Sequence, residues 1–171
     1  MPTSSAGDSR FWQFSLDFYS SSRVQRACLE LQDRAGVDVN VLFFALFLAT
    51  QRRKLSRADI QRIDGTIKSW REDAVVPLRV LRRKLKTGIA PFSTAETDAM
   101  RSAVKRIELE AEHLEQLWLE RNLPADSLGE VIDSSNVAAE SNIDAYGEYL
   151  NGFHYSPVAD LLLEFAAYVS R

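Results

Sequence analysis

Apolar side chains recur at steps of three and four residues along most of the chain, a spacing typical of α-helices that bury one face. The clearest series runs through Ile60, Ile63, Ile67, Trp70, Ala74, Leu78, Leu81 and Leu85. Alternating runs bounded by Asn-Gly or Asp-Gly turns, which predict strands, are nearly absent. At 171 residues the chain fits one domain. We therefore expect an all-α fold, a single helical bundle of about six to eight helices over residues 10–171, behind a disordered tail over residues 1–9.

Capping residues and helix breakers divide this pattern into segments. Gly36 is placed to end one helix, and Ser56 and Ser93 each open a capping box. Ser156 followed by a proline begins the last helix. Residues 122–137 lose the periodicity, so we expect a loop there, either alone or with a short helix within it. The expected helices span about 10–20, 22–35, 38–51, 57–87, 94–121, 138–151 and 157 onward.

The two longest segments predict an antiparallel helical hairpin. The 57–87 series continues through Pro77, which predicts one helix kinked near that proline; two shorter helices meeting at Val75–Pro77 are the alternative. Within 94–121 the apolar residues repeat in steps of four and three, as in a coiled coil. This repeat predicts a seam that packs against another helix, formed by Met100, Val104, Ile107, Ala111, Leu114 and Trp118.

The most apolar segment is GVDVNVLFFALFLAT, residues 36–50. From Val41 to Ala49 it has no polar side chain, yet it is far shorter than the ~20 residues of a membrane span, so we expect a central core helix. Asp38 and Asn40 stand at its start, where either can cap the helix by accepting hydrogen bonds from backbone N–H groups. The other polar side chain is then expected to be buried, and a buried carboxylate needs a partner.

The segment PLRVLRRKLK, residues 77–86, can supply a positively charged partner for this carboxylate. Arg79 and Arg83 lie four residues apart on one face, and Arg82 lies in the neighbouring row. We expect Asp38 to pair with Arg79 or Arg82 beside Trp70. If the cluster binds a ligand, the candidate ligand-binding residues are Asp38, Asn40, Trp70, Arg79 and Arg82.

The same segment holds five basic residues between positions 79 and 86, which could bind the phosphates of RNA. Its leucines also make it an ordinary amphipathic helix, and it contains no aromatic residue on which bases could stack. Association with RNA or the ribosome is therefore a second alternative, in which nucleic acid is an unlikely partner.

Charge is distributed unevenly. The net charge is −3, but residues 1–107 hold 19 basic and 11 acidic residues, whereas residues 108–171 hold 2 basic and 13 acidic residues. The two parts can neutralise each other within the fold, or the first part can present a surface to an acidic partner. Cys28 is the single cysteine, lies at helical spacing among apolar residues, and is expected in the core. With no visible signal sequence, these features predict a cytoplasmic protein.

Motifs for catalysis and cofactor binding are missing from the sequence, which has no G-x-S-x-G, no G-x-G-x-x-G and no P-loop. Glu110 and His113 form one E-x-x-H pair, but a di-iron site needs a second pair and two further glutamates. We expect no metal and no cofactor, and a role that is not enzymatic.

The combination of FWQFSLDFY, GVDVNVLFFALFLA and VVPLRVLRRKLK resembles a family of small, uncharacterised, mainly proteobacterial proteins with a conserved domain of unknown function. The likeness covers about residues 10–122, and its most specific elements are Asp38-Val39-Asn40 and Pro77-Leu78-Arg79 with Arg82. It implies an all-helical bacterial protein and carries no activity. We expect an interaction or regulatory module with a protein partner or self-association. The alternative is a binder of, or an enzyme acting on, a small anionic or lipid-like ligand in an interhelical pocket.

Overall fold

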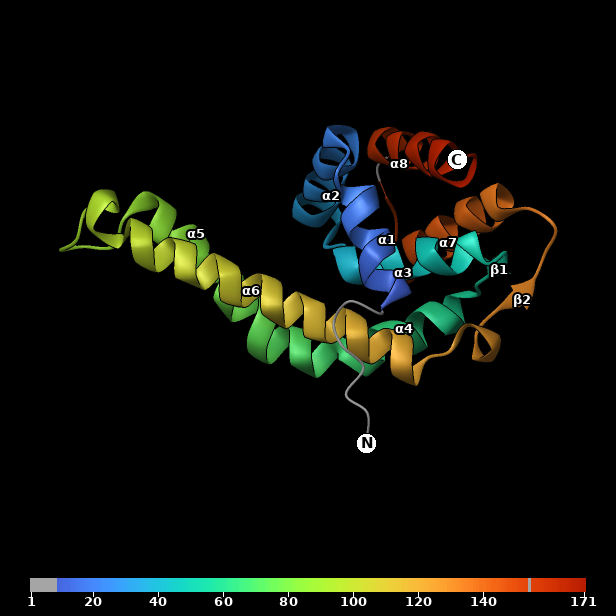
Figure 1. Cartoon of the computed structure of the whole chain (residues 1–171), viewed down its shortest axis with the longest axis horizontal. Coiled ribbons are helices and arrows are strands. Elements are labelled where there is room, and N and C mark those ends of the chain that lie inside the picture. The colour runs from blue at the N-terminus through green and yellow to red at the C-terminus, as the bar shows by residue number, and fades with distance from the viewer. Residues whose placement is uncertain (1–8, 154) are drawn as a thin grey trace.

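The computed structural model describes residues 9–153 and 155–171, and over these residues the chain is all-α, as predicted (Figure 1). Its helices are α1 (Arg10–Tyr19), α2 (Ser22–Ala35), α3 (Val39–Thr50), α4 (Arg57–Trp70), α5 (Val76–Thr87), α6 (Thr94–Asn122), α7 (Ser135–Tyr149) and α8 (Tyr155–Val169). The expected tail lies outside the described residues except for Ser9, whose side chain caps α1 by accepting from the backbone N–H of Trp12. No helix among the described residues combines the length and apolar character needed to cross a membrane.

Helix α3 is the centre of the core, as its sequence predicts. Every residue from Asn40 to Ala49 is buried, so this helix is covered on all sides. The aromatic stripe of α1 packs on one side of it, with the ring centroids of Phe11 and Phe44 at 5.0 Å and those of Phe18 and Phe43 at 5.4 Å. Helices α7 and α6 also pack against α3, which explains why it carries no polar face.

The predicted long helix from 57 to 87 is continuous, but it is not regular. Between α4 and α5 lies a π-helical turn, Arg71–Val75, in which the N–H of Val76 donates to the carbonyl oxygen of Arg71. Pro77 follows after one further residue; it has no N–H to donate, and its ring clashes with the preceding turn of a regular helix. The wider π turn lies where the proline disturbs the α-helical hydrogen bonds. It also carries Val75 into the buried interior.

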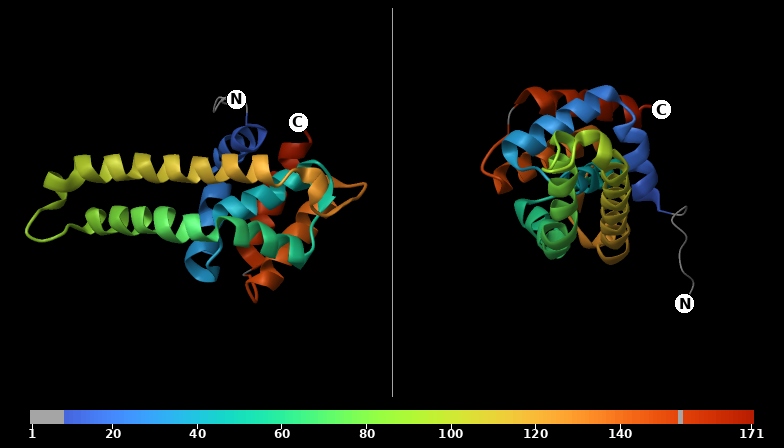
Figure 2. Two further views of the ribbon diagram at one scale, coloured as in Figure 1. Left: turned by 90° about the horizontal axis from the view of Figure 1, so that it is seen from below. Right: turned by 90° about the vertical axis from the view of Figure 1, so that its left-hand side faces the viewer.

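Helices α5 and α6 form the predicted antiparallel hairpin, which projects from the rest of the molecule (Figures 1 and 2). We call residues 76–107 the arm and the remainder the body. Helix α5 packs mainly against α6, and among the described residues of α5 Leu85 alone is buried. The arm is therefore a two-helix structure that exposes most of its surface.

The predicted seam of α6 is only half covered, which corrects the expectation. Val104 and Ala111 are buried, whereas four of its members are about half exposed: Met100, Ile107, Leu114 and Trp118. The buried face of α6 is rotated from the predicted one and includes Thr97, Glu108 and Glu115. Two glutamates on this face are tolerated because Glu108 is paired with arginines and burial raises the pKa of Glu115.

A two-stranded sheet closes the end of the body away from the arm (Figure 1). Strand β1 (Arg53–Lys54) pairs antiparallel with β2 (Glu130–Val131), with Arg53 opposite Val131. A 3-10 turn at Ala125–Ser127 precedes β2, within the segment expected to be a loop. The ladder was not predicted, because two residues are too short to show an alternating pattern.

Candidate functional site at the base of the arm

The N-terminus of α3 is organised by Asp38, which is its N-cap. The Oδ1 atom of Asp38 accepts hydrogen bonds from the backbone N–H groups of Asn40 at 2.7 Å and Val41 at 3.1 Å. Its own backbone N–H donates to the hydroxyl oxygen of Tyr146 on α7 at 2.9 Å. These bonds confirm the capping role and fix the start of the core helix against α7.

The second oxygen of Asp38 pairs with Arg71, and the expected pairing with Arg79 or Arg82 is wrong. Arg71 Nη1 lies 3.2 Å from Asp38 Oδ2 and 2.6 Å from Asp64 Oδ1. The hydroxyl of Tyr149 donates to the other oxygen of Asp64 at 2.8 Å. Arg71 begins the π turn, which places its side chain toward the cap of α3, whereas α5 carries the later arginines further along the arm.

The Asp38–Arg71–Asp64 cluster is mostly shielded from water, with side chains between 10% and 17% exposed. Burial alone would lower the pKa of Arg71, but the hydrogen bonds and charges of Asp64 and Asp38 outweigh it and raise the pKa. The guanidinium therefore stays charged and joins α3, α4 and the π turn.

Arg79 and Arg82 pair with α6 instead. Arg79 Nε donates to Glu108 at 3.1 Å and its Nη2 to Glu112 at 2.8 Å. Arg82 donates from Nε and Nη2 to the same Glu108, whose side chain is 7% exposed. The hydrogen bond that Arg82 donates to Glu108 is the largest of the causes that raise the pKa of Arg82. These charge-assisted pairs attach the first turns of α5 to α6.

The two remaining candidates, Asn40 and Trp70, each form a hydrogen bond with α6. Asn40 is buried, and its Oδ1 accepts from Gln116 Nε2 at 2.7 Å. Trp70 is 42% exposed, and its indole N–H donates to the carbonyl oxygen of Ala111 at 3.0 Å. The other four candidates line a common pocket, and Trp70 does not: they are Asp38, Asn40, Arg79 and Arg82.

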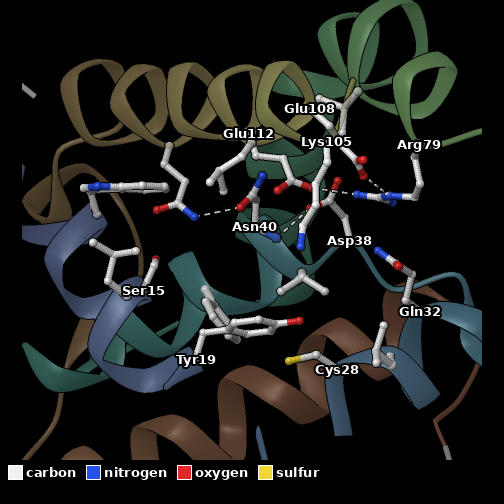
Figure 3. A pocket seen from close by; sticks show the side chains of 18 of the residues that line it. Ser15, Tyr19, Cys28, Gln32, Asp38, Asn40, Arg79, Lys105, Glu108 and Glu112 are labelled. Carbon is white, nitrogen blue, oxygen red and sulfur yellow. Dashed lines mark hydrogen bonds and ion pairs between the residues drawn. The ribbon is translucent and has the colours of Figure 1, made fainter. Parts of the chain in front are cut away.

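This pocket has a volume of about 390 Å³ and opens between the body and the base of the arm (Figure 3). Helices α1, α2, α3, α5 and α6 and the π turn contribute to it. Asp38, Asn40, Arg79 and Arg82 line it together with Ser15, Tyr19 and Gln116. Apolar side chains supply most of the remaining wall: Trp12, Leu16, Leu29, Val39, Phe43, Val75 and Leu109.

The pocket offers hydrogen bonds and apolar contact, with few reactive groups. Cys28 lines it but is buried, and burial raises the pKa of its thiol to about 12, so the thiol stays protonated at neutral pH. His113 stacks on Trp12, with ring centroids at 4.0 Å, and Glu110 is exposed on α6. Among the described residues, no three His, Cys, Asp or Glu side chains are grouped so that they could hold a metal ion.

Sequence reasoning missed Arg71, Asp64, Glu115 and Gln116. A signal was present for the pair of Asp64 and Arg71, because the two residues are seven apart on one helix face. In addition, Asp64 falls within the apolar series of Ile60, Ile63 and Ile67. A charged residue within an apolar stripe is expected to have a buried partner. No signal of this kind distinguishes Gln116 from the other polar residues of α6.

Comparison with known proteins identifies one relationship. A family model described as "Protein of unknown function (DUF2390)" matches residues 10–119. No curated protein and no solved structure matches the chain. The matched region contains α1 to α5 and nearly all of α6, and therefore the arm, the ion-pair cluster and every residue that lines the pocket. The chain belongs to the DUF2390 family.

Proposed function

We propose that the protein is a non-enzymatic interaction module whose arm binds an acidic surface of a partner protein. The arm, residues 76–107, holds eight basic and two acidic residues, a net charge of +6. The rest of the chain holds 13 basic and 22 acidic residues, a net charge of −9. The arm is therefore a positive projection on a negative body, and this separation favours an acidic partner.

Ion pairs neutralise part of the arm's positive charge, both near the body and, between Arg101 and Asp98, further along α6. Arg79 and Arg82 are paired with glutamates of α6, and Arg83 with Asp33 of α2 at 3.2 Å. Within the described residues, no ion pair involves four other exposed cations of the arm: Lys84, Lys86, Lys105 and Arg106. Charges of this kind are available to a partner.

The tip of the arm adds an apolar surface. Phe92 is 57% exposed and Ile89 is 39% exposed, and both lie in the turn that joins α5 and α6. The backbone N–H of Phe92 donates to the carbonyl oxygen of Ile89 at 2.9 Å, which gives the turn a fixed shape. An exposed aromatic residue on a segment rich in basic residues suits a protein interface, because aromatic residues and arginine are enriched there. This projecting tip is the observation that carries the proposal.

The same geometry weakens the RNA alternative. Of the five basic residues between positions 79 and 86, three are paired with carboxylates, which leaves Lys84 and Lys86. Phe92 is the one aromatic residue of the arm, whereas binding of single-stranded RNA uses several stacking platforms. A protein surface therefore fits the arm better than a nucleic acid. A cytoplasmic location is part of this proposal, because a single buried cysteine suits a reducing compartment.

The test is capture of partners from a bacterial lysate on immobilised protein, with two arm variants compared with the parent chain. Phe92→Asp removes the apolar anchor, and Lys84→Glu with Lys86→Glu reverses the free charge. The control is Val137→Asp, which also replaces an exposed apolar side chain by aspartate, at a 53%-exposed site on α7. We expect one protein to be retained by the parent and the control, lost from both arm variants, and to present an acidic surface. Retention of a partner unaffected by both arm changes would contradict the proposal, as would arm-dependent retention of RNA that nuclease removes.

Self-association through the arm is a separate outcome. Sedimentation of the purified protein over a range of concentrations would show it as a dimer that the Phe92→Asp variant does not form. In that case the acidic partner would be a second copy of the chain.

A further inference from the structure

The pocket at the base of the arm is distinct from the arm's tip and has the features of a small-molecule site. Its volume of about 390 Å³ falls within the range of known ligand pockets. It is lined by side chains from the body and from the arm, as Figure 3 shows, so it is present only when the two are packed together.

The mouth of the pocket is apolar although it faces water. Leu16 of α1, Leu29 of α2 and Leu109 of α6 each line it, and they are 48%, 51% and 52% exposed. Tyr19 adds a ring that is 39% exposed. Single exposed leucines are common on protein surfaces, but here three helices contribute them to one opening. This arrangement suits the apolar part of a ligand.

The interior of the pocket contains polar atoms without partners. Ser15 and Gln116 are 5% and 4% exposed, and neither Ser15 Oγ nor Gln116 Oε1 has a hydrogen-bond partner among residues 9–153 and 155–171. Buried polar groups in proteins are nearly always paired, because an unpaired one loses its hydration without compensation. The carbonyl oxygen of Gln116 can only accept, so a ligand that satisfies it must donate a hydrogen bond.

The charges around the pocket do not select a charged ligand. Three acidic residues and three basic residues line it: Asp38, Glu108 and Glu112, with Arg79, Arg82 and Lys105. Both guanidinium groups are already bonded to carboxylates of α6, and Asp38 is bonded to Arg71. Lys105 forms no ion pair among the described residues, but it is exposed, so water already solvates its charge. An anion at the two arginines would have to compete with the existing pairs, whereas a neutral head group would not. The geometry therefore favours a lipid-like ligand over an anionic one.

We propose that this pocket binds a small neutral amphiphile. Its head group carries hydroxyl or amide N–H donors and bonds to Ser15 and Gln116, and its apolar part lies against Leu16, Leu29 and Leu109. This ligand class is independent of the arm's partner, because none of the residues at the arm's tip lines the pocket.

The experiment is calorimetric titration of the full chain with three probes that share one hydrocarbon chain and differ in the head group. Decanoyl glycerol has a neutral head with hydroxyl donors, decanoate has an anionic head, and decylammonium has a cationic head. All are used below the concentration at which they form micelles. We expect saturable one-to-one binding of decanoyl glycerol, at least about 10-fold tighter than either ion, because the acidic and basic residues that line the pocket balance and its one cation without an ion pair among the described residues, Lys105, is exposed to water.

Three variants locate the binding. Ser15→Ala deletes an atom that has no partner in the protein, so the fold keeps its stability, and we expect affinity for decanoyl glycerol to fall about 3- to 10-fold, the effect of one hydrogen bond. Leu109→Asp should weaken it about 10-fold or more by removing apolar contact at the mouth. Leu114→Asp is the matched control, because Leu114 lies on the same helix, is 55% exposed and does not line the pocket.

Each outcome either supports or overturns the proposed binding site. Loss of affinity in Ser15→Ala and Leu109→Asp, with Leu114→Asp unchanged, supports the assignment. No saturable binding, or binding that all three variants leave unchanged, overturns the site. Tighter binding of decanoate than of decanoyl glycerol overturns the neutral head group. Because Phe92→Asp should bind decanoyl glycerol like the parent chain, failure here is distinguishable from failure of the proposed arm interaction.

Discussion

The carboxylate of Asp38 bonds to two structures at once, the N-terminus of α3 and the guanidinium of Arg71. One oxygen accepts from the free N–H groups of the most apolar helix, where a negative charge also interacts favourably with the helix dipole. The other shares Arg71 with Asp64, so one buried cation is held by two carboxylates. Polar side chains at the start of an apolar helix thus join that helix to the base of the arm.

Replacing Asp38 tests the value of this shared charge. Asp38→Asn keeps an oxygen for the cap but removes the charge that Arg71 faces, and Asp64 remains as its partner. We expect the free energy of unfolding to fall by about 1–3 kcal/mol, the range for a hydrogen bond to a charged group. Urea denaturation measures it.

Asp33→Asn is the control, because Asp33 forms an exposed ion pair with Arg83. Such pairs contribute about 0–1 kcal/mol, so this variant should differ little from the parent. Equal effects of the two substitutions would show that the Asp38 pair is no stronger than a surface pair.

Glu115 provides a pH-dependent test. It is buried on α6, and burial, followed by the charge of Asp38, raises its pKa to about 8, while the side chain of Asn40 opposes the shift. Arg71 opposes this shift and Glu112 adds to it. The unfolded carboxyl loses its proton near its ordinary pKa of ~4.3, so between the two values the folded state holds more protons. Stability must therefore fall as the pH rises through this window.

Glu115→Gln removes that loss because the amide stays neutral. We expect the variant to match the parent near pH 5 and to exceed it by more than about 1 kcal/mol near pH 9, where the parent must hold a buried charge. Thermal unfolding across this range measures the difference. Glu110→Gln, an exposed glutamate on the same helix, should show no such trend. A gap that stays constant with pH would contradict the buried protonated state.

Prediction from sequence succeeded for residues that act locally and failed for residues that act across the fold. The cap formed by Asp38 depends on its own helix and follows from residue type and position. Its ion-pair partner depends on the π turn that places Arg71, and sequence periodicity cannot show a single turn of different hydrogen bonding. The same limit applies to Trp70, which is on the expected helix but does not face the pocket.

Among the elements, the helices were predictable and the short strands were not. The capping boxes at Ser56 and Ser93 form as expected, and the helix boundaries agree within about three residues. The sheet of β1 and β2 instead depends on the close approach of two loops far apart in sequence. Gly129 permits that approach: its φ is +60°, and a Cβ atom there would lie 2.4 Å from the carbonyl oxygen of Lys54.

Gly129→Ala should therefore separate the two strands. We expect a loss of more than about 2 kcal/mol, because strain from the left-handed backbone adds to a collision with main-chain atoms. Gly36→Ala is the matched control, with φ of +66° and no atom within 4 Å of an added Cβ, and should cost about 1 kcal/mol from backbone strain alone. Chemical denaturation of both variants measures the difference. Equal losses would show that the contact with Lys54 adds nothing.

At the scale of the whole molecule, the chain separates a negative, well-packed body from a positive arm. The hairpin was predictable from the two long periodic segments, but its projection was not. The seam of α6 predicted full burial, but the buried face is rotated toward Glu108 and Glu115. The structure leaves four members of the seam about half exposed: Met100, Ile107, Leu114 and Trp118. The pocket was anticipated only as a cluster of four polar residues with Trp70, since its apolar walls come from four helices and the π turn.

The most direct test of the account is photo-crosslinking at the tip of the arm in living cells. A photoreactive benzoylphenylalanine at position 92 keeps the aromatic ring of Phe92, and the same residue at position 137 of α7 is the control. We predict a single protein adduct from position 92, absent from position 137 and abolished by Lys84→Glu with Lys86→Glu. An adduct of equal yield from both positions, or one that survives the charge reversal, would contradict the claim that the basic arm is the docking element.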